Sequence, residues 1–250
     1  METQDWDSIA GEFSDRVFQI TDHDTDGVIL STAQRLGSTL KHAGDFGCGA
    51  GAVTRLLAGH FGKVTGLDQS AGLVREAEQA TAADNVEYVH ADLARPKPLG
   101  FRFDVSFCVN VLINRNHDVR EKIARNVAAH TKRGGPAVFV VPSLESTLRT
   151  YQTVVDCQVR GGIGRSAAVR SANRQAGEEI ESVVDGIVSV GDSPTKHFLS
   201  DELEAFLAEA GFDVQSMVRV QFPWNQEIDN PPRSLGPPTP WDWLAECRRR

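Results

Sequence analysis

The sequence has no excess of positive charge and no long apolar run. Its 250 residues include 26 lysines and arginines against 34 aspartates and glutamates, which gives a formal net charge of −8. A protein that binds long nucleic acid needs a basic face to neutralise phosphates, so this balance argues against such a partner. No apolar run approaches the roughly 20 residues of a membrane-spanning helix, so we also expect no membrane segment.

Cysteine patterns and processing signals are also lacking. The cysteines Cys48, Cys108, Cys157 and Cys247 do not have the spacing of a metal site or a redox pair. Cys48 and Cys108 fall in expected core positions, which predicts reduced thiols and no bound metal. The acidic opening Met-Glu-Thr-Gln-Asp-Trp-Asp lacks the cationic and apolar parts of a signal peptide. Together these features predict a cytoplasmic protein.

The most informative stretch is a glycine turn between an expected strand and an expected helix. Residues 45–51 read Asp-Phe-Gly-Cys-Gly-Ala-Gly, and Ala-Val-Thr-Arg-Leu-Leu-Ala follows over 52–58. Alternating glycines let the backbone turn tightly and approach a ligand closely. The helix N-terminus behind them offers free N–H groups and a positive dipole end.

A second strand follows over 63–68 and ends on an acid, Asp68, which lies 21 positions after Gly47. In nucleotide-binding βαβ units, an acid about 20 residues after the first glycine binds the ribose hydroxyls. A strand, glycine turn, helix, strand and terminal acid in this order therefore predict a nucleoside-binding unit.

The pattern Asp-x-Gly-x-Gly-x-Gly resembles motif I of the class I S-adenosylmethionine (SAM)-dependent methyltransferases, and it differs from the Gly-x-Gly-x-x-Gly of NAD-binding folds. The resemblance covers about residues 44–142 and becomes general beyond 143. It implies that the chain binds SAM and releases S-adenosylhomocysteine (SAH). It also implies that Asp68 binds the ribose hydroxyls and that Asp92, in Val89-His-Ala-Asp92, binds the adenine amino group.

The SAM-binding residues expected from the resemblance lie in these motifs and in the N-terminal segment: Asp45, Gly47, Cys48, Gly49, Gly51, Asp68, Gln69, Asp92, Leu93, Asn110 and Phe13. Some have alternative roles. Asp45 alternatively holds only the glycine loop, and Asp92 is alternatively an acid of a turn. Phe13 either folds over the SAM pocket or anchors its segment on the core.

Strands and helices alternate through the first half of the chain. Strands are expected over 42–47, 63–68, 85–91, 103–109 and 136–141, with helices over 51–60, 70–82 and 117–131. This alternation predicts an α/β fold with a Rossmann-like, doubly wound, mostly parallel sheet. A helix over 200–211 and strands over 212–222 and 241–247 fit the late helix and antiparallel edge that complete seven strands in the resembling family.

We expect a single domain with four parts. Residues 1–41 form an N-terminal helical lid, which includes a helix over 27–41 capped by Thr25 or Asp26. Residues 42–142 form the SAM-binding core, and residues 143–198 form a small cap insertion. Residues 199–250 complete the sheet, starting with the helix that Ser200 is expected to cap. Within the cap, the pattern over 164–180 is compatible with either a helix or a loop.

In the resembling family, the transferred methyl group lies at the end of the fourth strand. This chain reads Asn110-Val-Leu-Ile-Asn-Arg-Asn-His117 there. His117 is a candidate base, although a lone histidine at a helix start is alternatively a solvent-facing residue. Asn114 and Arg115 are candidates for binding the acceptor. Asn110 orients the acceptor, contacts SAM or serves the local turn.

A second candidate cluster, Ser193-Pro-Thr-Lys-His-Phe198, precedes the late helix. Lys196 is a candidate for binding an acidic acceptor, and His197 is a second candidate base. The alternative for both is a solvated loop. Tyr151 is a candidate lining residue of the acceptor site, with core packing as its alternative.

The sequence thus predicts a SAM-dependent methyltransferase. It moves the methyl group to an O, N, S or C nucleophile of a small molecule by in-line displacement, as a monomer or homodimer. One alternative is a non-catalytic SAM-binding protein. Another is an aminopropyltransferase-like enzyme, which is disfavoured because residues 110–114 lack the acids that such enzymes place there. The chain also lacks the Asn/Asp-Pro-Pro-aromatic signature of nucleobase amino methyltransferases.

Overall fold

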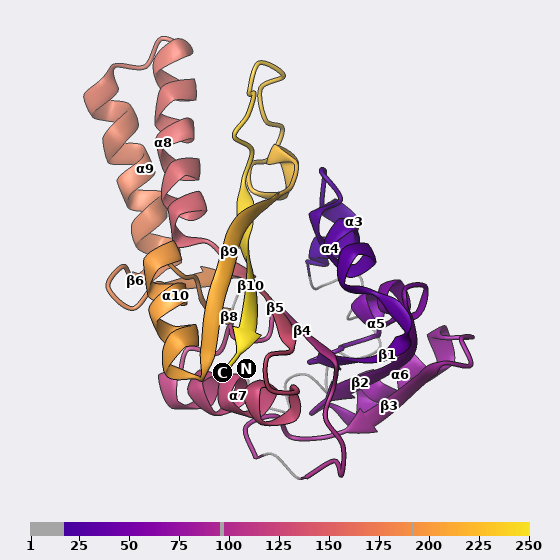
Figure 1. Cartoon of the computed structure of the whole chain (residues 1–250). Coiled ribbons are helices and arrows are strands. Elements are labelled where there is room, and N and C mark those ends of the chain that lie inside the picture. Colours follow the sequence, from indigo (N-terminus) through magenta and orange to yellow (C-terminus); the bar gives the residue numbers. More distant parts are fainter. Residues whose placement is uncertain (1–17, 96–97, 192) are drawn as a thin grey trace.

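The computed structural model describes residues 18–95, 98–191 and 193–250, and its centre is a seven-stranded sheet (Figure 1). The strand order is β3-β2-β1-β4-β5-β10-β9. Five strands are parallel: β1 (Ser38–Phe46), β2 (Phe61–Asp68), β3 (Val86–His90), β4 (Val105–Val109) and β5 (Pro136–Pro142). The strand β10 (Trp241–Arg249) runs antiparallel to both β5 and β9 (Phe212–Gln221). The predicted doubly wound, mostly parallel sheet with an antiparallel edge is confirmed.

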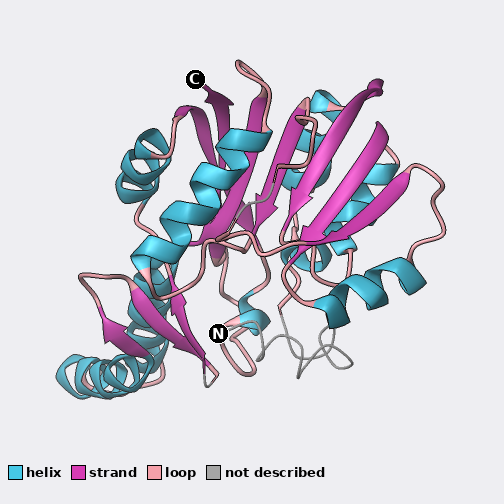
Figure 2. Ribbon diagram, turned by 90° about the horizontal axis from the view of Figure 1, so that it is seen from below, coloured by secondary structure: helices cyan, strands magenta, loops and turns pink. Residues whose placement is uncertain are grey.

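Helices pack on both faces of this sheet (Figure 2). One apolar cluster joins one face to α4 (Val28–Leu36) and α5 (Ala52–Ala58), while a second cluster joins the other face to α7 (His117–His130) and α10 (Ser200–Glu209). The helix α6 (Ala71–Ala80) follows β2, and the short α3 (Ile20–His23) precedes α4. Since helices cover both faces, the central strands are apolar on both sides.

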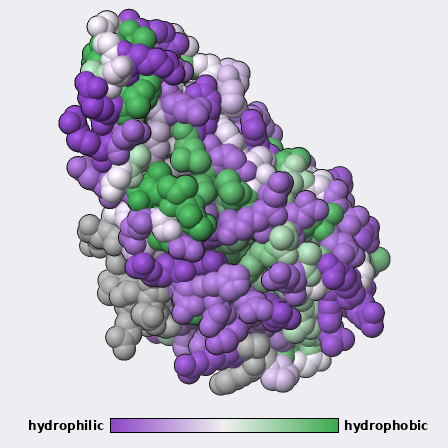
Figure 3. Space-filling view, turned by 90° about the vertical axis from the view of Figure 1, so that its left-hand side faces the viewer, coloured by the Kyte–Doolittle hydropathy of each residue, from purple (hydrophilic) through white to green (hydrophobic). Residues whose placement is uncertain are grey.

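Residues 143–198, the expected cap insertion and called the cap below, contain a helical hairpin and a small sheet. The hairpin is formed by α8 (Leu144–Arg160) and α9 (Arg165–Glu179), so the ambiguous stretch over 164–180 is helical. The strands β6 (Ile180–Ser182), β7 (Ile187–Val190) and β8 (Ser193–Lys196) form an antiparallel sheet. Seen from the hairpin side, the surface is mostly hydrophilic, with an apolar patch below the hairpin (Figure 3). The hairpin stands beside the connection from β9 to β10, which contains the turn η2 (Trp224–Gln226) (Figure 1).

Two boundaries differ from prediction. The helix expected over 27–41 ends at Leu36, and residues 38–41 belong to β1, so the lid and the sheet meet earlier than expected. Leu40, which falls within the expected helix, is 93% exposed on the strand. The chain leaves the helix at Gly37, and β1 begins to pair with β2 at once, at Ser38. The cap is also different, because the Asp24 carboxylate accepts the N–H of Ile29.

Ser200 does not cap α10. The N-cap position is occupied by Leu199, and the N–H of Ser200 donates to the Glu145 carboxylate at 2.7 Å. Glu202 in turn accepts the N–H of Leu199 at 3.3 Å. An acid from α8 thus satisfies an N–H group at the start of this helix, which no local sequence pattern indicates.

Packing around β1 requires a glycine at position 44. A Cβ at Gly44 would lie 2.5 Å from the ring of Phe103, which is fully buried. Gly44→Ala is expected to lower the free energy of unfolding by about 1–3 kcal/mol, because the ring has to move within a packed core. Gly59→Ala is the matched control, since its Cβ would lie 3.7 Å from the Leu56 carbonyl oxygen and φ is −73°. Urea unfolding monitored by circular dichroism measures both, and equal stability of the two variants would contradict this account.

Candidate functional site

The candidate site begins at the turn between β1 and α5. Gly47, Gly49 and Gly51 have φ values of +76°, +52° and +85°, which lie in the left-handed region that side chains rarely adopt. The N–H groups of Gly47 and Cys48 both donate to the carbonyl of Leu67, at 2.7 and 3.0 Å. These bonds hold the glycine loop against the end of β2.

The turn after β4 lies directly over this loop. A Cβ at Gly47 would lie 2.3 Å from Cγ2 of Val111. The backbone of the loop and the segment that follows β4 are therefore as close as a glycine permits, which links the two strand ends that border the site.

Asp45, near the carboxyl end of β1, accepts a hydrogen bond from the Thr54 hydroxyl at 2.6 Å. Its side chain is buried, with 1% exposure. Burial raises the pKa of Asp45 to about 7, against the opposing effect of the hydrogen bond from Thr54. The observed partner therefore ties β1 to α5.

Asp68 connects three elements. One oxygen of its carboxylate accepts the N–H of Gly49 at 3.0 Å, and the other accepts the N–H of Ser70 at 2.8 Å. Burial raises the pKa of Asp68, while the hydrogen bonds from Ser70 and Gly49 act in the opposite direction. A carboxylate oxygen has more than one acceptor position, so each oxygen can still receive a ligand hydroxyl. Ser70 caps α6 as predicted, since its hydroxyl accepts the N–H of Leu73.

The other predicted SAM-binding residues lie around the same strand ends. The N–H of Ala91 donates to the carbonyl of Asp68 at 2.7 Å, which brings the segment after β3 beside β2. Asp92 is exposed there and accepts the N–H of Ala94. Leu93 is buried, and the Gln69 carbonyl lies 3.0 Å from the His90 ring. Cys48 is buried in the loop, and Phe13 lies outside the described residues.

On the other side of the loop, Asn110 meets an acid that the sequence reasoning missed. Asn110 has a φ of +54°, and its amide nitrogen donates to the Asp242 carboxylate at 3.4 Å. Asp242 lies opposite Pro142 at the end of β5, is 5% exposed, and has a pKa that burial raises to about 7. The available signal was an acid between two tryptophans at the start of the strand that begins Trp-Asp-Trp-Leu-Ala.

The predicted residues that follow Val111 contact the cap or α10 instead. Asn114 pairs with Thr195 of β8, and Arg115 forms an ion pair with Glu181 at 3.3 Å. His117 is exposed at the start of α7, with its ring 5.8 Å from that of Phe206. The structure does not bring these three residues to the glycine loop.

Lys196 and His197 are inside the cap. Lys196 is fully buried, and its ammonium group contacts Glu202 and the carbonyl of Asp185. The His197 Nδ1 atom lies 2.9 Å from the Thr147 hydroxyl, and its Nε2 atom is buried without a partner among the described residues. Burial, and next the charge of Lys196, lower the pKa of His197 to about 4, so its ring is neutral at neutral pH. The predicted solvated loop is therefore incorrect.

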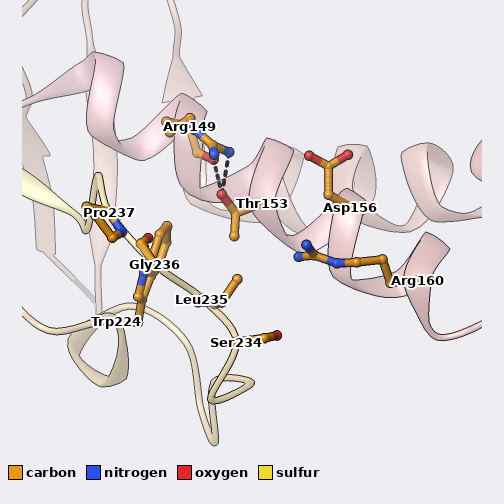
Figure 4. Close-up of a pocket in the computed structure, with 9 residues that line it drawn as sticks. All are labelled: Arg149, Thr153, Asp156, Arg160, Trp224, Ser234, Leu235, Gly236 and Pro237. Carbon is orange, nitrogen blue, oxygen red and sulfur yellow. Dashed lines mark hydrogen bonds between the residues drawn. The ribbon is translucent and has the colours of Figure 1, made fainter.

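A cavity of about 150 Å³ lies between α8 and the β9–β10 connection (Figure 4). Arg149 and Arg160 contribute to its wall, and neither guanidinium forms an ion pair with a carboxylate in the described part of the chain. Tyr151, also on α8, donates to the Glu179 carboxylate. Because α8 follows the carboxyl end of β5, this cavity lies beyond the edge of the sheet at which ligands of such folds bind. A second hollow, of about 390 Å³, is at the opposite edge, near Gly62 and Glu87.

Within residues 18–95, 98–191 and 193–250, no group of three or more His, Cys, Asp or Glu side chains is arranged to hold a metal ion. No helix in the same residues is both long and apolar enough to span a bilayer.

The buried Asp45 gives a testable pH dependence. Its pKa is about 7 in the folded protein, above the 3.8 of an unperturbed aspartate, so the folded state holds a proton that the unfolded state has lost. The contribution of Asp45 to stability is therefore present at low pH and decreases as the pH rises towards 7 and above. Between pH 5.5 and 8 this decrease is about 2 kcal/mol.

Asp45→Asn keeps an oxygen that can accept the Thr54 hydroxyl but cannot titrate. The free energy of unfolding of this variant should fall less than that of the wild type between pH 5.5 and 8, as measured by urea unfolding at both values. Equal changes in the two proteins would contradict a raised pKa at Asp45.

Comparisons with known proteins agree with this geometry. A family model described as "Methyltransferase domain" matches residues 44–135. An uncharacterized methyltransferase of Mycobacterium tuberculosis is 29% identical over 150 residues, which cover 58% of this chain and 76% of the relative. A ubiquinone biosynthesis O-methyltransferase of Coxiella burnetii is 32% identical over 101 residues, which cover 40% of this chain and 42% of the relative.

The fold is also similar to solved structures. The DhpI-SAM-HEP complex has a TM-score of 0.62 and 20% identity, and the match covers 98% of this chain and 94% of that one. DhpI has also been solved with SAH. With the glycine loop and the acids at the ends of β2 and β3, the match of residues 44–135 to a methyltransferase domain, the methyltransferase relatives and the similar fold support a class I SAM-dependent methyltransferase.

Proposed function

We propose that this methyltransferase transfers the SAM methyl group to a nucleophile of a small molecule by in-line displacement. The net charge of −8 argues against a nucleic-acid acceptor. The cavity of about 150 Å³ beside α8 is of a size suited to part of a small molecule. The cytoplasmic location and the monomeric or homodimeric state stay predictions from the sequence.

The position of the Asp68 carboxylate is the observation that best supports the proposed SAM site. It bonds to Gly49 in the glycine loop and to Ser70 before α6, so it lies where the loop and the end of β2 meet. The predicted role of Asp68, binding the ribose hydroxyls, fits this position. The predicted role of Asp92, binding the adenine amino group, fits the neighbouring end of β3.

The glycine loop fits the close approach of a ligand, since a Cβ on Gly47 would collide with Val111. Asp45 and Cys48 support this loop from the buried side. Bound SAM supplies a methyl group on a positively charged sulfur, which is already activated, so the chain's main task is to position the acceptor.

The predicted base and acceptor-binding residues differ in how well their positions suit these roles. His197 is neutral at neutral pH, as a base should be, but its known contact is with Thr147 inside the cap. His117 is exposed next to α10. Tyr151 does not line the cavity, and its hydroxyl donates to Glu179 of α9. Asn114, Arg115 and Lys196 are likewise engaged in contacts with the cap or α10. Acceptor binding by the cavity wall, which includes Arg149 and Arg160, is therefore better supported than binding by any of these four residues.

Asp68→Ala tests the SAM site. We expect its affinity for SAM and SAH to fall at least tenfold, because the ribose hydroxyls lose charged hydrogen-bond partners. Isothermal titration calorimetry measures both affinities. Asp84→Ala, at an exposed acid before β3, is the matched control and should bind like the wild type.

Because Asp68 also accepts two backbone N–H groups, Asp68→Asn accompanies it as a variant that keeps an acceptor oxygen. Circular dichroism establishes that each variant is folded. Wild-type affinity in folded Asp68→Ala would contradict the proposed site.

A further inference from the structure

Asp242 is a buried carboxylate with very little to stabilise its charge. Its side chain is 5% exposed, and the amide of Asn110, at 3.4 Å, is its hydrogen-bond partner in the described part of the chain. A buried carboxylate is costly unless it is paired and fully hydrogen-bonded. Such groups cluster at functional sites, where a ligand can complete their contacts.

The partner of Asp242 is itself unusual. Asn110 adopts a left-handed backbone conformation, with φ at +54°, and its N–H donates to the carbonyl of Val140 at 2.8 Å. Its side-chain oxygen is buried and has no partner among the described residues. Conformations of this kind cluster at functional sites. The Asp242 carboxylate and the Asn110 oxygen are both acceptors, so together they suit a ligand that brings a hydrogen-bond donor.

The pair lies at the methionine end of the expected SAM site. Val111, the residue after Asn110, approaches Gly47 so closely that a Cβ there would lie 2.3 Å from it. Asp242 faces Pro142 across the β5–β10 pair, at the carboxyl edge of the sheet. Asp68 and Asp92 are on the other side of the loop, at the ends of β2 and β3. A ligand that spans the loop from Asp92 would therefore present its far end to Asn110 and Asp242.

We propose that the Asp242 carboxylate, positioned by Asn110, faces the sulfonium of bound SAM and accepts the proton of an acceptor O–H or N–H group. This inference rests on the proposed function. The acceptor oxygen or nitrogen forms a bond to the methyl carbon while the carbon–sulfur bond breaks and its electron pair stays on sulfur. The acceptor's proton passes to Asp242, which becomes a neutral carboxylic acid. The acceptor class is thus a hydroxyl or an amine, rather than a group that is already anionic.

The surroundings of Asp242 support this role. Burial raises its pKa to about 7, a value suited to accepting a proton near neutral pH, while the bond from Asn110 opposes the shift. Glu227, in the β9–β10 connection, interacts electrostatically with Asp242 and with Glu179 at the end of α9. Arg219 of β9 is directed to the ring of Trp241, 4.0 Å from its centre. Glu227 and Glu179 are both acids, so they disfavour a second negative charge beside Asp242 and favour a donor or a cation there.

The first test counts protons released on binding and needs no acceptor. SAM and SAH differ by the methyl group and the positive charge on sulfur. If Asp242 faces that charge, SAM binding should ionise it, and SAH binding should not. At pH 7, calorimetry in buffers of different ionisation enthalpy should show about half a proton more released with SAM than with SAH. Asp242→Asn should abolish this difference.

The second test uses a ligand that carries a hydrogen-bond donor where SAM carries its methyl group. Sinefungin is a SAM analogue in which a carbon-bound primary amine replaces the sulfonium methyl group. Asp242→Asn should weaken sinefungin binding by about tenfold or more, because a charge-assisted hydrogen bond is lost, while SAH affinity stays unchanged. Glu246→Gln is the matched control, an acid on the same strand that pairs with Arg35, and it should bind all three ligands like the wild type.

Asn110→Gly is a second variant for the case in which Asp242→Asn does not fold. It removes the positioning amide but suits the left-handed backbone, and it should reduce both the proton difference and the sinefungin affinity. Equal proton release with SAM and SAH, or sinefungin affinity unchanged in folded Asp242→Asn, would overturn the inference. If the wild type binds neither SAM nor SAH, the proposed function itself fails, and that result is distinct from the others.

Discussion

The bonds from Asp68 to Gly49 and Ser70 are the interaction on which the SAM side of the structure depends. The carboxylate lies at the end of β2, yet its partners are the glycine loop after β1 and the start of α6. Two further bonds from the loop reach the Leu67 carbonyl. A loop of positive-φ glycines has little conformational preference of its own, so these contacts define its shape. The same carboxylate thus builds the loop and offers its remaining acceptor positions to a ligand.

Much of the fold could be predicted because its determinants are local. Helices separate β1, β2 and β3 from one another, and α7 separates β4 from β5. The apolar runs, the glycine turn and the Ser70 cap all act within a few residues. The errors in the predicted helix boundaries occur where a residue distant in the sequence determines the boundary. The helix before β1 ends at Leu36 because residues from 38 onward pair with β2. The start of α10 uses Glu145, an acid 55 residues away, in place of Ser200.

The candidate site shows the same division. Asp45, Asp68 and the glycines fall in one continuous motif, so the sequence could name them and the structure could bring them together. Lys196 and His197 are adjacent in sequence to each other but are enclosed by α8, α10 and the small sheet of the cap. Asp242 could not be assigned a place near Asn110 from the sequence, because 132 residues separate them and only the pairing of β10 with β5 joins them.

The strand β10 lies between β5 and β9 in the sheet. The half of the site around Asp68 and the half around Asp242 therefore have different folding requirements. The bond between Gly49 and Asp68 closes a segment of 19 residues, whereas the bond between Asn110 and Asp242 closes one of 132. Contacts of short sequence separation form with a smaller loss of chain entropy. Conditions that release β9 and β10 while β1 and β2 stay paired would produce a protein that keeps the proposed donor site but has lost Asp242, the proposed contact of the acceptor. Retention of donor binding is therefore an incomplete measure of whether this enzyme is correctly folded.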